Sequence, residues 1–332
     1  MRILIVRLSA IGDTIHTLPL AAALRRLYPT AWIGWVVEKP SAPLVENNPI
    51  LDWTYVLPKG WLKSFREIRA LRRALRGQKP DIVFDVQGLS KSAVAAYVSG
   101  APVRIGFTRG ESREIAPYLD NRRVAPRGVH AIDKTLSLLD ALEAESPGPA
   151  EFVFPPCSSG DGAALCEMPE RFVLMGPWGS FTAKLWPLER FLQTAVVLHA
   201  KTGLRSFMLG HGEKERSAVL ALSAERPDIL QPAPDVSITG VVELARRASV
   251  FIGCDSFPMH AAAAVGCPTL GLFGVTNPER LGPYGPNGHA VYERLTLPRS
   301  TRERARLSNE NMAALSVGKV VKSALAALQK PL

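Results

Sequence analysis

The chain has 332 residues, of which 47% are hydrophobic, and its 40 Lys and Arg residues outnumber 30 Asp and Glu residues to give a net charge of +10. This length predicts two domains that each bury a core, and 26 Gly and 27 Pro residues are too few for a collagen-like or largely disordered chain. The positive charge is typical of proteins that bind nucleic acid, an anionic membrane surface or a polyanionic small substrate, and it does not choose among them.

Short apolar strands alternate with helices along the first half of the chain. A strand over 2–7 leads into the polar turn 9–13, and apolar residues at helical spacing follow as far as Arg26. Continuous apolar strands that alternate with helices are typical of a parallel sheet covered on both faces. The other elements that we expect in this half are strands at 31–37, 81–86 and 103–105 and helices at 62–76 and 89–98.

A stretch rich in Pro, Gly and Ser over 145–162 predicts a linker, after which the alternation starts again. We therefore expect an α/β protein with two Rossmann-like units. Ligands of such sheets bind beyond the carboxyl ends of the strands, so the cleft between two facing units is the expected site. The second half predicts strands at 171–175, 204–209, 250–253 and 268–273 and helices at 187–200, 240–248, 258–265 and 312–328.

The cysteines and the N-terminus bear on the cellular compartment. Asp13 and His16 interrupt the apolar N-terminal stretch, and no run of 18 or more uncharged apolar residues occurs in the sequence. Four scattered cysteines without a CxxC pair are too sparse for a disulfide framework and indicate a reducing compartment. We expect a soluble, cytoplasmic protein whose membrane contact, if any, is peripheral. The cysteines are Cys157, Cys166, Cys254 and Cys267.

Asp13 directly follows the first strand, at a predicted helix start. It is either an N-cap, which stabilises a helix by about 1 kcal/mol, or a general base that faces whatever binds at this edge of the sheet. The dinucleotide fingerprint GxGxxG is absent from this turn, which disfavours a nicotinamide enzyme.

The segment 176–187 follows the first strand of the second half. The hydroxyl groups of Ser180 and Thr182 and the ammonium of Lys184 lie among small residues, just before the helix that Pro187 begins. Hydroxyls, backbone N–H groups and one point charge at a helix start suit a phosphate, although the order of a Walker A loop is missing. A purely structural loop is about equally compatible with this segment.

The segment 253–260 repeats this arrangement after another strand. Asp255 and Ser256 stand at a helix start, and His260 lies in the first turn of that helix. Each of these residues taken alone is more often structural, as a cap or a core histidine. Three such segments at strand ends of one chain together favour a ligand site over three coincidental caps.

The positive charge is concentrated in the first half. Residues 1–150 hold 21 Lys and Arg against 14 Asp and Glu, whereas the remainder holds 19 against 16. Seven basic residues stand from Lys63 to Lys79, with Glu67 as the one acidic residue between them. They form either an ordinary solvated face or a collar for an anionic acceptor or membrane surface. The stripe of this helix that we expect to be buried consists of Leu62, Phe65, Ile68, Leu71 and Leu75.

Three segments carry a resemblance to a known family. They are MRILIVRLSAIGDTIHTLPLAAAL at the N-terminus, the AKLWP loop, and CDSFPMHAAAAVGCPTLGLFGVTNPERLGPYG. These segments resemble the ADP-heptose:lipopolysaccharide heptosyltransferases of glycosyltransferase family 9. Residues 85–93, Glu38 and the pair Arg113–Glu114 are most similar to heptosyltransferase I. One position departs from the family, because Phe257 stands where the loop Asp-Ser/Thr-Gly has glycine.

The resemblance implies a GT-B fold, in which two Rossmann-like domains with parallel sheets face a central cleft. It implies an acceptor-binding domain over 1–155, a nucleotide-sugar-binding domain over 156–311, and a C-terminal helix over 312–332 that crosses back to the first domain. The implied reaction is inverting, needs no metal or cofactor, and moves heptose from ADP-heptose to a Kdo sugar of the lipopolysaccharide inner core. The implied partners are the nucleotide sugar, anionic Kdo-lipid A and the cytoplasmic surface of the inner membrane.

The resemblance also implies roles for single residues. Asp13 would be the base that deprotonates the acceptor hydroxyl, and Lys184 would offset the charge that grows on the departing diphosphate. Glu213 would hold the adenosine ribose. The other implied donor-binding residues are Ser180, Thr182, Asp255, Ser256 and His260, and the implied acceptor-binding residues are Lys63, Lys91 and Arg113.

Other functions stay open from the sequence. Heptosyltransferase II activity, or another family 9 transferase with a different acceptor or donor sugar, would use the same fold and chemistry. A GT-B nucleotide-sugar epimerase would need more acid and base residues near the sugar than Asp13, Asp255 and His260. A basic nucleic-acid binder is disfavoured because no recognisable nucleic-acid motif occurs.

Overall fold

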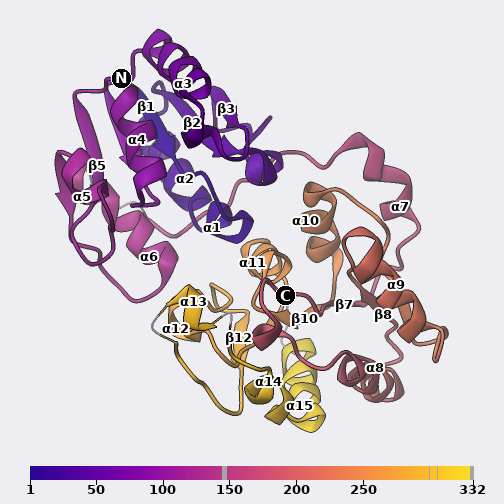
Figure 1. The fold of residues 1–332 in the computed structure, drawn as a ribbon. Helices are drawn as coiled ribbons and strands as arrows, with labels where there is room; N and C mark the ends of the chain where they lie inside the picture. The colour runs from indigo at the N-terminus through magenta and orange to yellow at the C-terminus, as the bar shows by residue number, and fades with distance from the viewer. Residues whose placement is uncertain (144–147, 299, 305, 330–332) are drawn as a thin grey trace. The chain divides into compact units, whose positions relative to one another are not determined.

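The computed structural model describes residues 1–143, 148–298, 300–304 and 306–329. The chain forms two compact units, Met1–Pro156 and Cys157–Leu332, and each is built on a parallel sheet of its own (Figure 1). The boundary falls inside the predicted linker. Linker residues 145–147 and the last residues of the predicted C-terminal helix, 330–332, lie outside the described residues.

The sheet of the first unit has the strand order β3-β2-β1-β4-β5-β6, and all its pairings are parallel. In the central strand β1, Ile3 is in register with Ile33 of β2 and with Ile82 of β4. The strands are β1 (Arg2–Val6), β2 (Trp32–Glu38), β3 (Trp53–Leu57), β4 (Ile82–Asp85), β5 (Val103–Phe107) and β6 (Arg122–Val124).

Alternate residues of β1 pack on opposite faces of this sheet, as the two-residue period of a strand requires. Ile3 and Ile5 belong to a core with α2, and Leu4 and Val6 belong to a core with α3 and α4. The single helix expected after β1 is two helices, because α1 ends at Ile15 and α2 begins at Leu18 with Pro19 in its first turn. The helices are α1 (Ile11–Ile15), α2 (Leu18–Leu27), α3 (Phe65–Gln78), α4 (Ser90–Val98), α5 (Ala116–Leu119) and α6 (Ala131–Leu136), with 3₁₀ turns η1 (Lys39–Leu44), η2 (Trp61–Lys63) and η3 (Ser137–Leu142).

The buried stripe predicted for α3 is shorter than expected. Leu71 and Leu75 are fully buried, whereas Leu62 is 38% exposed and Phe65 is 79% exposed. These two residues lie where the chain enters the helix, next to Trp61, which is buried in the core with Leu71 and Leu75. The beginning of α3 therefore offers apolar as well as basic side chains to solvent.

The second unit has a parallel sheet with the strand order β12-β11-β10-β7-β8-β9. On one face Val173 and Met175 pack against α8, α9 and α15, and on the other Phe172 and Leu174 pack against α10 and α11. The strands are β7 (Val173–Gly176), β8 (Ser206–Met208), β9 (Leu230–Pro232), β10 (Val250–Cys254), β11 (Thr269–Leu272) and β12 (Gly288–Val291). The helices are α7 (Gly162–Cys166), α8 (Leu188–Thr202), α9 (Gly212–Ser223), α10 (Ile238–Arg247), α11 (Phe257–Ala264), α12 (Pro278–Leu281), α13 (Thr301–Arg304), α14 (Glu310–Ala314) and α15 (Val317–Leu328), with 3₁₀ turns η4 (Ser159–Asp161) and η5 (Thr182–Lys184).

The C-terminal helix differs from the expectation in one respect. It is split into α14 and α15, and Ser316 caps the second helix by accepting a hydrogen bond from the Lys319 N–H. The buried residues Val320 and Ala324 of α15 join the core of the second unit, where α15 lies beside α8 (Figure 1). The described packing of this helix is with the second unit, and its expected return to the first domain stays a prediction. No helix within the described ranges is long and apolar enough to cross a membrane.

Candidate functional site

Asp13 lies on α1, just beyond the carboxyl end of β1, and its side chain is 40% exposed. The Arg7 Nη2 atom lies 2.8 Å from the Asp13 Oδ2 atom, and the Ala10 N–H donates to the same oxygen at 3.2 Å. Burial raises the pKa of Asp13. The Arg7 guanidinium, His16 and the Ala10 N–H lower this pKa by more than burial raises it, so it lies below its usual value. The group is a carboxylate at neutral pH and is open to solvent, as a base must be.

Lys91, Glu38 and Ser9 form a second polar cluster at the same edge of the first sheet. The Lys91 Nζ atom lies 3.0 Å from both carboxylate oxygens of Glu38 and donates to the Ser9 hydroxyl at 2.7 Å. Ser9 follows β1, Glu38 ends β2 and Lys91 stands in the first turn of α4 after β4. Because these three strands are neighbours, residues far apart in sequence converge beyond their carboxyl ends. The structure thus brings Lys91 and Glu38, which sequence reasoning singled out separately, into one ion pair.

Of the other predicted acceptor residues, one is held near this group. The Arg113 N–H donates to the Gly88 carbonyl at 2.9 Å, in the turn that precedes α4, and the Arg113 side chain is exposed. Lys63 is exposed at the end of η2. Among the described residues, no hydrogen bond or ion pair joins Lys63 to Lys91 or Arg113.

The strongest cluster of the second unit joins Lys184 to Asp255. The Lys184 Nζ atom lies 2.6 Å from the Asp255 Oδ2 atom, and the His260 Nε2 atom lies 3.5 Å from Asp255 Oδ1. The side chains of Lys184 and Asp255 are only 11% and 5% exposed. Burial raises the pKa of Asp255, yet His260 and Lys184 hold it well below its usual range. The two predicted segments, 176–187 and 253–260, therefore form one site.

Buried contacts that sequence reasoning missed hold this loop in place. The Cys254 thiol donates to the Pro177 carbonyl at 3.3 Å and accepts from the Trp186 N–H at 3.5 Å, so both ends of the loop are tied to β10. The Trp178 indole N–H donates to the Leu209 carbonyl at 2.8 Å, just after β8. A buried cysteine at the end of a strand has no sequence signal for such a role, because its partners are backbone groups.

The remaining donor-side residues lie around this ion pair or apart from it. Ser180 and Thr182 are exposed on the same loop as Lys184. Ser256 is the residue before α11, and its hydroxyl donates to the Cys254 carbonyl instead of capping the helix. Glu213 is exposed in the first turn of α9, after β8, and no hydrogen bond or ion pair among the described residues joins it to Lys184 or Asp255. The strands before these segments, β10, β7 and β8, are neighbours in the sheet.

Phe257 begins α11, with Pro258 directly after it. Proline suits this position because the first N–H groups of a helix have no intrahelical partner. The helix start after Asp255 is therefore preserved although the family's glycine is replaced.

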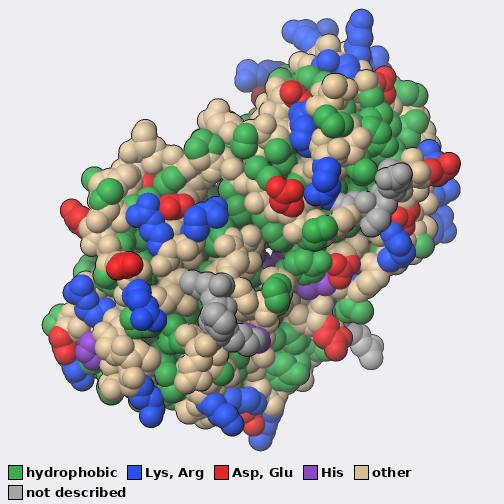
Figure 2. Space-filling view, turned by 180° about the vertical axis from the view of Figure 1, so that it is seen from behind, with side chains coloured by type: hydrophobic (Ala, Val, Ile, Leu, Met, Phe, Trp, Pro, Cys, Tyr) green, Lys and Arg blue, Asp and Glu red, His purple; other side chains and the backbone are tan. Residues whose placement is uncertain are grey.

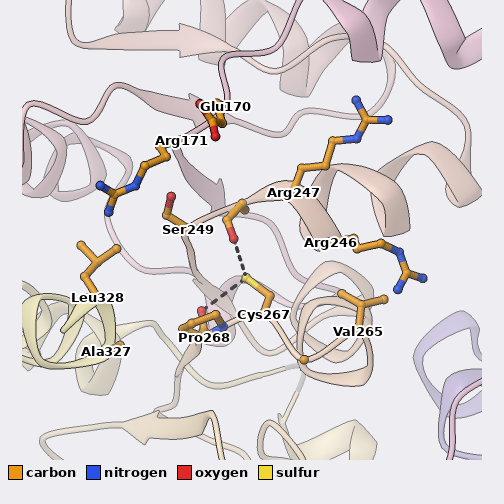
Figure 3. A pocket seen from close by; sticks show the side chains of 12 residues that line it. Glu170, Arg171, Arg246, Arg247, Ser249, Val265, Cys267, Pro268, Ala327 and Leu328 are labelled. Carbon is orange, nitrogen blue, oxygen red and sulfur yellow. Dashed lines mark hydrogen bonds between the residues drawn. The ribbon is translucent and has the colours of Figure 1, made fainter. Parts of the chain in front are cut away.

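A cavity of about 480 Å³ lies at the other end of the second sheet, before β7, β10 and β11. Figure 3 shows that the guanidinium groups of Arg171, Arg246 and Arg247 point away from one another around it. Glu243 accepts from Arg246 at 3.3 Å and from Arg247 at 2.9 Å. Divergent and paired charges do not form an anion site at this cavity.

Comparisons with known proteins identify the family of this chain. The sequence profile of glycosyltransferase family 9 (heptosyltransferase) matches residues 68–310. The chain is 32% identical over 302 residues to lipopolysaccharide heptosyltransferase 1 of Pseudomonas aeruginosa, covering 86% of this chain and 82% of that protein. This chain belongs to glycosyltransferase family 9. The enzyme is also 29% identical over 311 residues to lipopolysaccharide heptosyltransferase 1 of Escherichia coli K12, covering 86% of this chain and 92% of that protein.

Solved structures support the fold of this glycosyltransferase. E. coli heptosyltransferase WaaC with ADP-2-deoxy-2-fluoro heptose matches with a TM-score of 0.77 at 23% identity, covering 97% of this chain and 98% of that one. E. coli ADP-heptose lps heptosyltransferase II matches with a TM-score of 0.76 at 21% identity, covering 99% and 98%. The predicted α/β fold of the GT-B type, with two Rossmann-like parallel sheets, is confirmed.

Proposed function

We propose that this glycosyltransferase moves heptose from ADP-heptose to a Kdo sugar of the lipopolysaccharide inner core, as a heptosyltransferase I. The observation that carries this proposal is the 32% identity, over most of both chains, to lipopolysaccharide heptosyltransferase 1 of P. aeruginosa. Relatives named lipopolysaccharide heptosyltransferase 3 are 25% identical or less. E. coli heptosyltransferase WaaC and E. coli ADP-heptose lps heptosyltransferase II match the fold of this chain about equally well, so heptosyltransferase II activity remains the alternative that the substrate assay below tests.

The second unit is proposed to bind the nucleotide sugar. Lys184 supplies the positive charge that a departing ADP diphosphate needs, and the loop hydroxyls of Ser180 and Thr182 and the helix start after Ser256 offer hydrogen bonds to phosphate oxygens. Asp255 is kept ionised and so accepts hydrogen bonds from sugar hydroxyls, with His260 and Lys184 fixing its orientation. Glu213, exposed at the start of α9, suits the ribose hydroxyls.

The first unit is proposed to bind the acceptor. The Asp13 carboxylate takes the proton of the acceptor hydroxyl as its oxygen forms a bond to the anomeric carbon of the heptose. The bond between that carbon and the β-phosphate oxygen breaks, ADP leaves from the opposite face with the electron pair of that bond, and the configuration of the anomeric carbon is inverted. Lys91 and Arg113 are positioned to bind acidic groups of the acceptor, with Lys63 a further candidate at the entrance to α3.

The surface around α3 is proposed to contact the cytoplasmic face of the inner membrane. Figure 2 shows Lys and Arg side chains gathered over this helix. The exposed Phe65 and Leu62 lie at its start, next to Lys63 and Arg66. Aromatic and basic side chains together favour binding to an anionic lipid surface, because aromatic side chains insert at the membrane interface and basic side chains pair with the lipid headgroups.

The substitution Asp13→Asn tests the proposed reaction. It keeps the shape of the side chain but removes the site for the proton, so transfer to Kdo-lipid A should fall by about 10²–10⁴-fold. Binding of ADP-heptose, measured by calorimetry, should be unchanged. The matched control is Asp52→Asn, which removes the carboxylate of another Arg-paired aspartate of the first unit, 2.6 Å from Arg25.

The choice of substrates needs a separate assay. Wild-type enzyme is offered ADP- and UDP-sugars together with Kdo-lipid A or an already heptosylated core, and products are read by mass spectrometry. Heptose transfer to the heptosylated core alone would replace the proposal with heptosyltransferase II activity. Near wild-type turnover of Asp13→Asn would remove Asp13 as the base.

A further inference from the structure

Arg7 is the residue that contacts Asp13 most closely, and the sequence patterns did not single it out. It directly follows β1, and its side chain is 15% exposed. One guanidinium nitrogen, Nη2, lies 2.8 Å from the Asp13 Oδ2 atom, and the other, Nη1, donates to the Val86 carbonyl at 3.1 Å. The Arg7 carbonyl in turn accepts from the Trp35 indole N–H at 3.1 Å. One guanidinium nitrogen of Arg7 thus binds the Val86 carbonyl, and the other binds the Asp13 carboxylate.

This arrangement differs from an ordinary surface ion pair. A surface pair orders two flexible side chains and contributes little, whereas the Arg7 side chain is largely buried and one of its guanidinium nitrogens already donates to the Val86 carbonyl, just after β4. Because the guanidinium is planar and rigid, its direction sets the direction of the oxygen it binds. The Ala10 N–H, at 3.2 Å, donates to that same oxygen. Asp13 Oδ2 therefore has two donors.

We propose that Arg7 is a positioning residue for the reaction, which aims the Asp13 carboxylate at the approaching acceptor hydroxyl. The proposal rests on the proposed role of Asp13 as the base. With Oδ2 held by Arg7 and Ala10, Oδ1 is the oxygen that receives the proton. The bond formed is O–H on Oδ1, and the proton comes from the acceptor hydroxyl as that oxygen attacks.

The charges around Asp13 set the expected direction of a pH effect. Arg7 and His16 favour its ionised form, and the His16 Nδ1 atom lies 3.9 Å from Asp13 Oδ1. The ring of His130, at the start of α6, packs edge-on against His16, with ring centroids 5.8 Å apart. On the β4 side Arg7 also attracts the buried Asp85. The Lys91–Glu38 pair reaches this edge through Ser9.

Losing Arg7 leaves burial as the main influence on Asp13, and burial raises its pKa. The acid limb of kcat/KM reports the essential base of the free enzyme. An opposite charge at this distance shifts a pKa by about 1–3 units, so the limb should move to higher pH by that amount without Arg7.

The experiment compares Arg7→Gln, Arg7→Lys and the control Arg25→Gln by full pH profiles of heptose transfer. Arg25→Gln breaks a similar ion pair of the first unit, in which the Arg25 side chain is 24% exposed and Asp52 is 41% exposed. We expect Arg7→Gln to lower kcat by on the order of 10²-fold, as misplacement of a reacting group does, and to move the acid limb upward. The KM for ADP-heptose should stay within about twofold. Arg7→Lys keeps the positive charge but not the planar set of guanidinium donors. The acid side of its pH profile should match that of wild type, and its kcat should lie between those of Arg7→Gln and wild type.

Two outcomes overturn the proposal: a wild-type pH profile and kcat in Arg7→Gln, or the same limb shift in Arg25→Gln. If Arg7→Gln fails to fold, Arg7→Lys decides, because full kcat in that variant contradicts the need for the guanidinium fork. The underlying base assignment fails separately. If Asp13→Asn is active, Asp13 is not the base; if Asp13→Asn is inactive and Arg7→Gln behaves as wild type, only the inference about Arg7 is lost.

Discussion

In the proposed function, the Lys184–Asp255 pair serves both folding and chemistry. Both side chains are almost fully buried, so each charge depends on the other and on His260 for its stabilisation. An ammonium held at a fixed point stabilises a growing diphosphate charge without moving, which is the main advantage of a preorganised site over water.

Lys184→Ala should lower kcat by about 10²–10³-fold, the usual loss when one charge-stabilising donor is removed. The measurement is the rate of heptose transfer at saturating donor and acceptor. Lys201→Ala, at an exposed lysine in the last turn of α8, is the control and should leave the rate unchanged. A loss of tenfold or less in Lys184→Ala would make Lys184 a structural residue only.

Asp85 and Asp120 are buried carboxyl groups of the first unit that the proposed reaction does not use. Both oxygens of Asp120 and Oδ2 of Asp85 lack a hydrogen-bond partner among the described residues. Burial raises the pKa of Asp120 to about 8, and the charge of Asp85 adds to this. Burial likewise raises the pKa of Asp85 to about 6, although nearby hydrogen bonds and Arg7 oppose it. The pair titrates as a unit, so at neutral pH it holds a proton that the unfolded chain would release.

Asp120→Asn should therefore change how stability depends on pH. A raised folded pKa gives stability that is complete below the unfolded value, near pH 4, and is lost as pH rises towards about 8. Between pH 5 and 8 the free energy of unfolding should fall more steeply in wild type than in Asp120→Asn, by up to about 1.4 kcal/mol per pH unit. Urea unfolding at several pH values measures this. Glu143→Gln, at a side chain that is 85% exposed, is the control, and parallel slopes in wild type and Asp120→Asn would contradict the buried proton.

At the scale of elements, α3 combines a buried edge with an exposed basic face. Leu71 and Leu75 anchor it to the sheet, while Arg69, Arg72 and Arg73 remain exposed. Because these three arginines are exposed, they can be replaced without disturbing the packing of Leu71 and Leu75.

Replacing Arg69, Arg72 and Arg73 together by Gln should weaken binding to vesicles that contain anionic lipid, by about 1 kcal/mol for each charge near the surface. The effect should shrink as salt is raised, because screening shortens the range of these charges. Co-sedimentation at low and high salt measures it. The control changes the same charge on the second unit, with Lys201, Lys214 and Arg205 replaced by Gln. Equal losses in both triple variants would show a general charge effect and no surface at α3.

At the scale of the whole molecule, each unit has its own sheet and its own hydrophobic cores. Each also has its own polar cluster at the carboxyl ends of its central strands. The proposed division of labour, with the acceptor on one unit and the donor on the other, therefore predicts that each ligand stabilises one unit.

ADP should protect backbone amides of the second unit from hydrogen exchange and leave the β1–α2 region of the first unit nearly unchanged. A ligand at 100 times its Kd adds about 2.7 kcal/mol to the stability of the state that binds it. Exchange followed by mass spectrometry, with and without ADP, resolves the two units. Equal protection around Asp13 and Lys184 would contradict a nucleotide site confined to the second unit.

The sequence by itself determined the α/β class, the two units and the eight inner strands, because buried parallel strands are continuous apolar runs. The four strands it missed, β3, β6, β9 and β12, are the edges of the two sheets. Edge strands pair on one side only and need fewer apolar residues, so β6 exposes two arginines and β9 ends in a proline. The patterns of β6 and β9 are too weak to read without the neighbour they pair with, whereas β3, with the sequence WTYVL, has an ordinary strand pattern and could have been predicted.

The sequence also found the strand-end segments that hold the candidate site, since polar residues after an apolar strand mark the carboxyl edge of a sheet. Only the tertiary structure decided which partners meet there. Arg7 with Asp13 joins residues six apart. Lys91 follows β4 and Glu38 ends β2, two strands that lie on either side of β1, and Lys184 and Asp255 follow the neighbouring strands β7 and β10. The strand order brings such residues together, and burial strengthens the attraction between their charges. Neither the strand order nor the burial can be read from spacing along the chain.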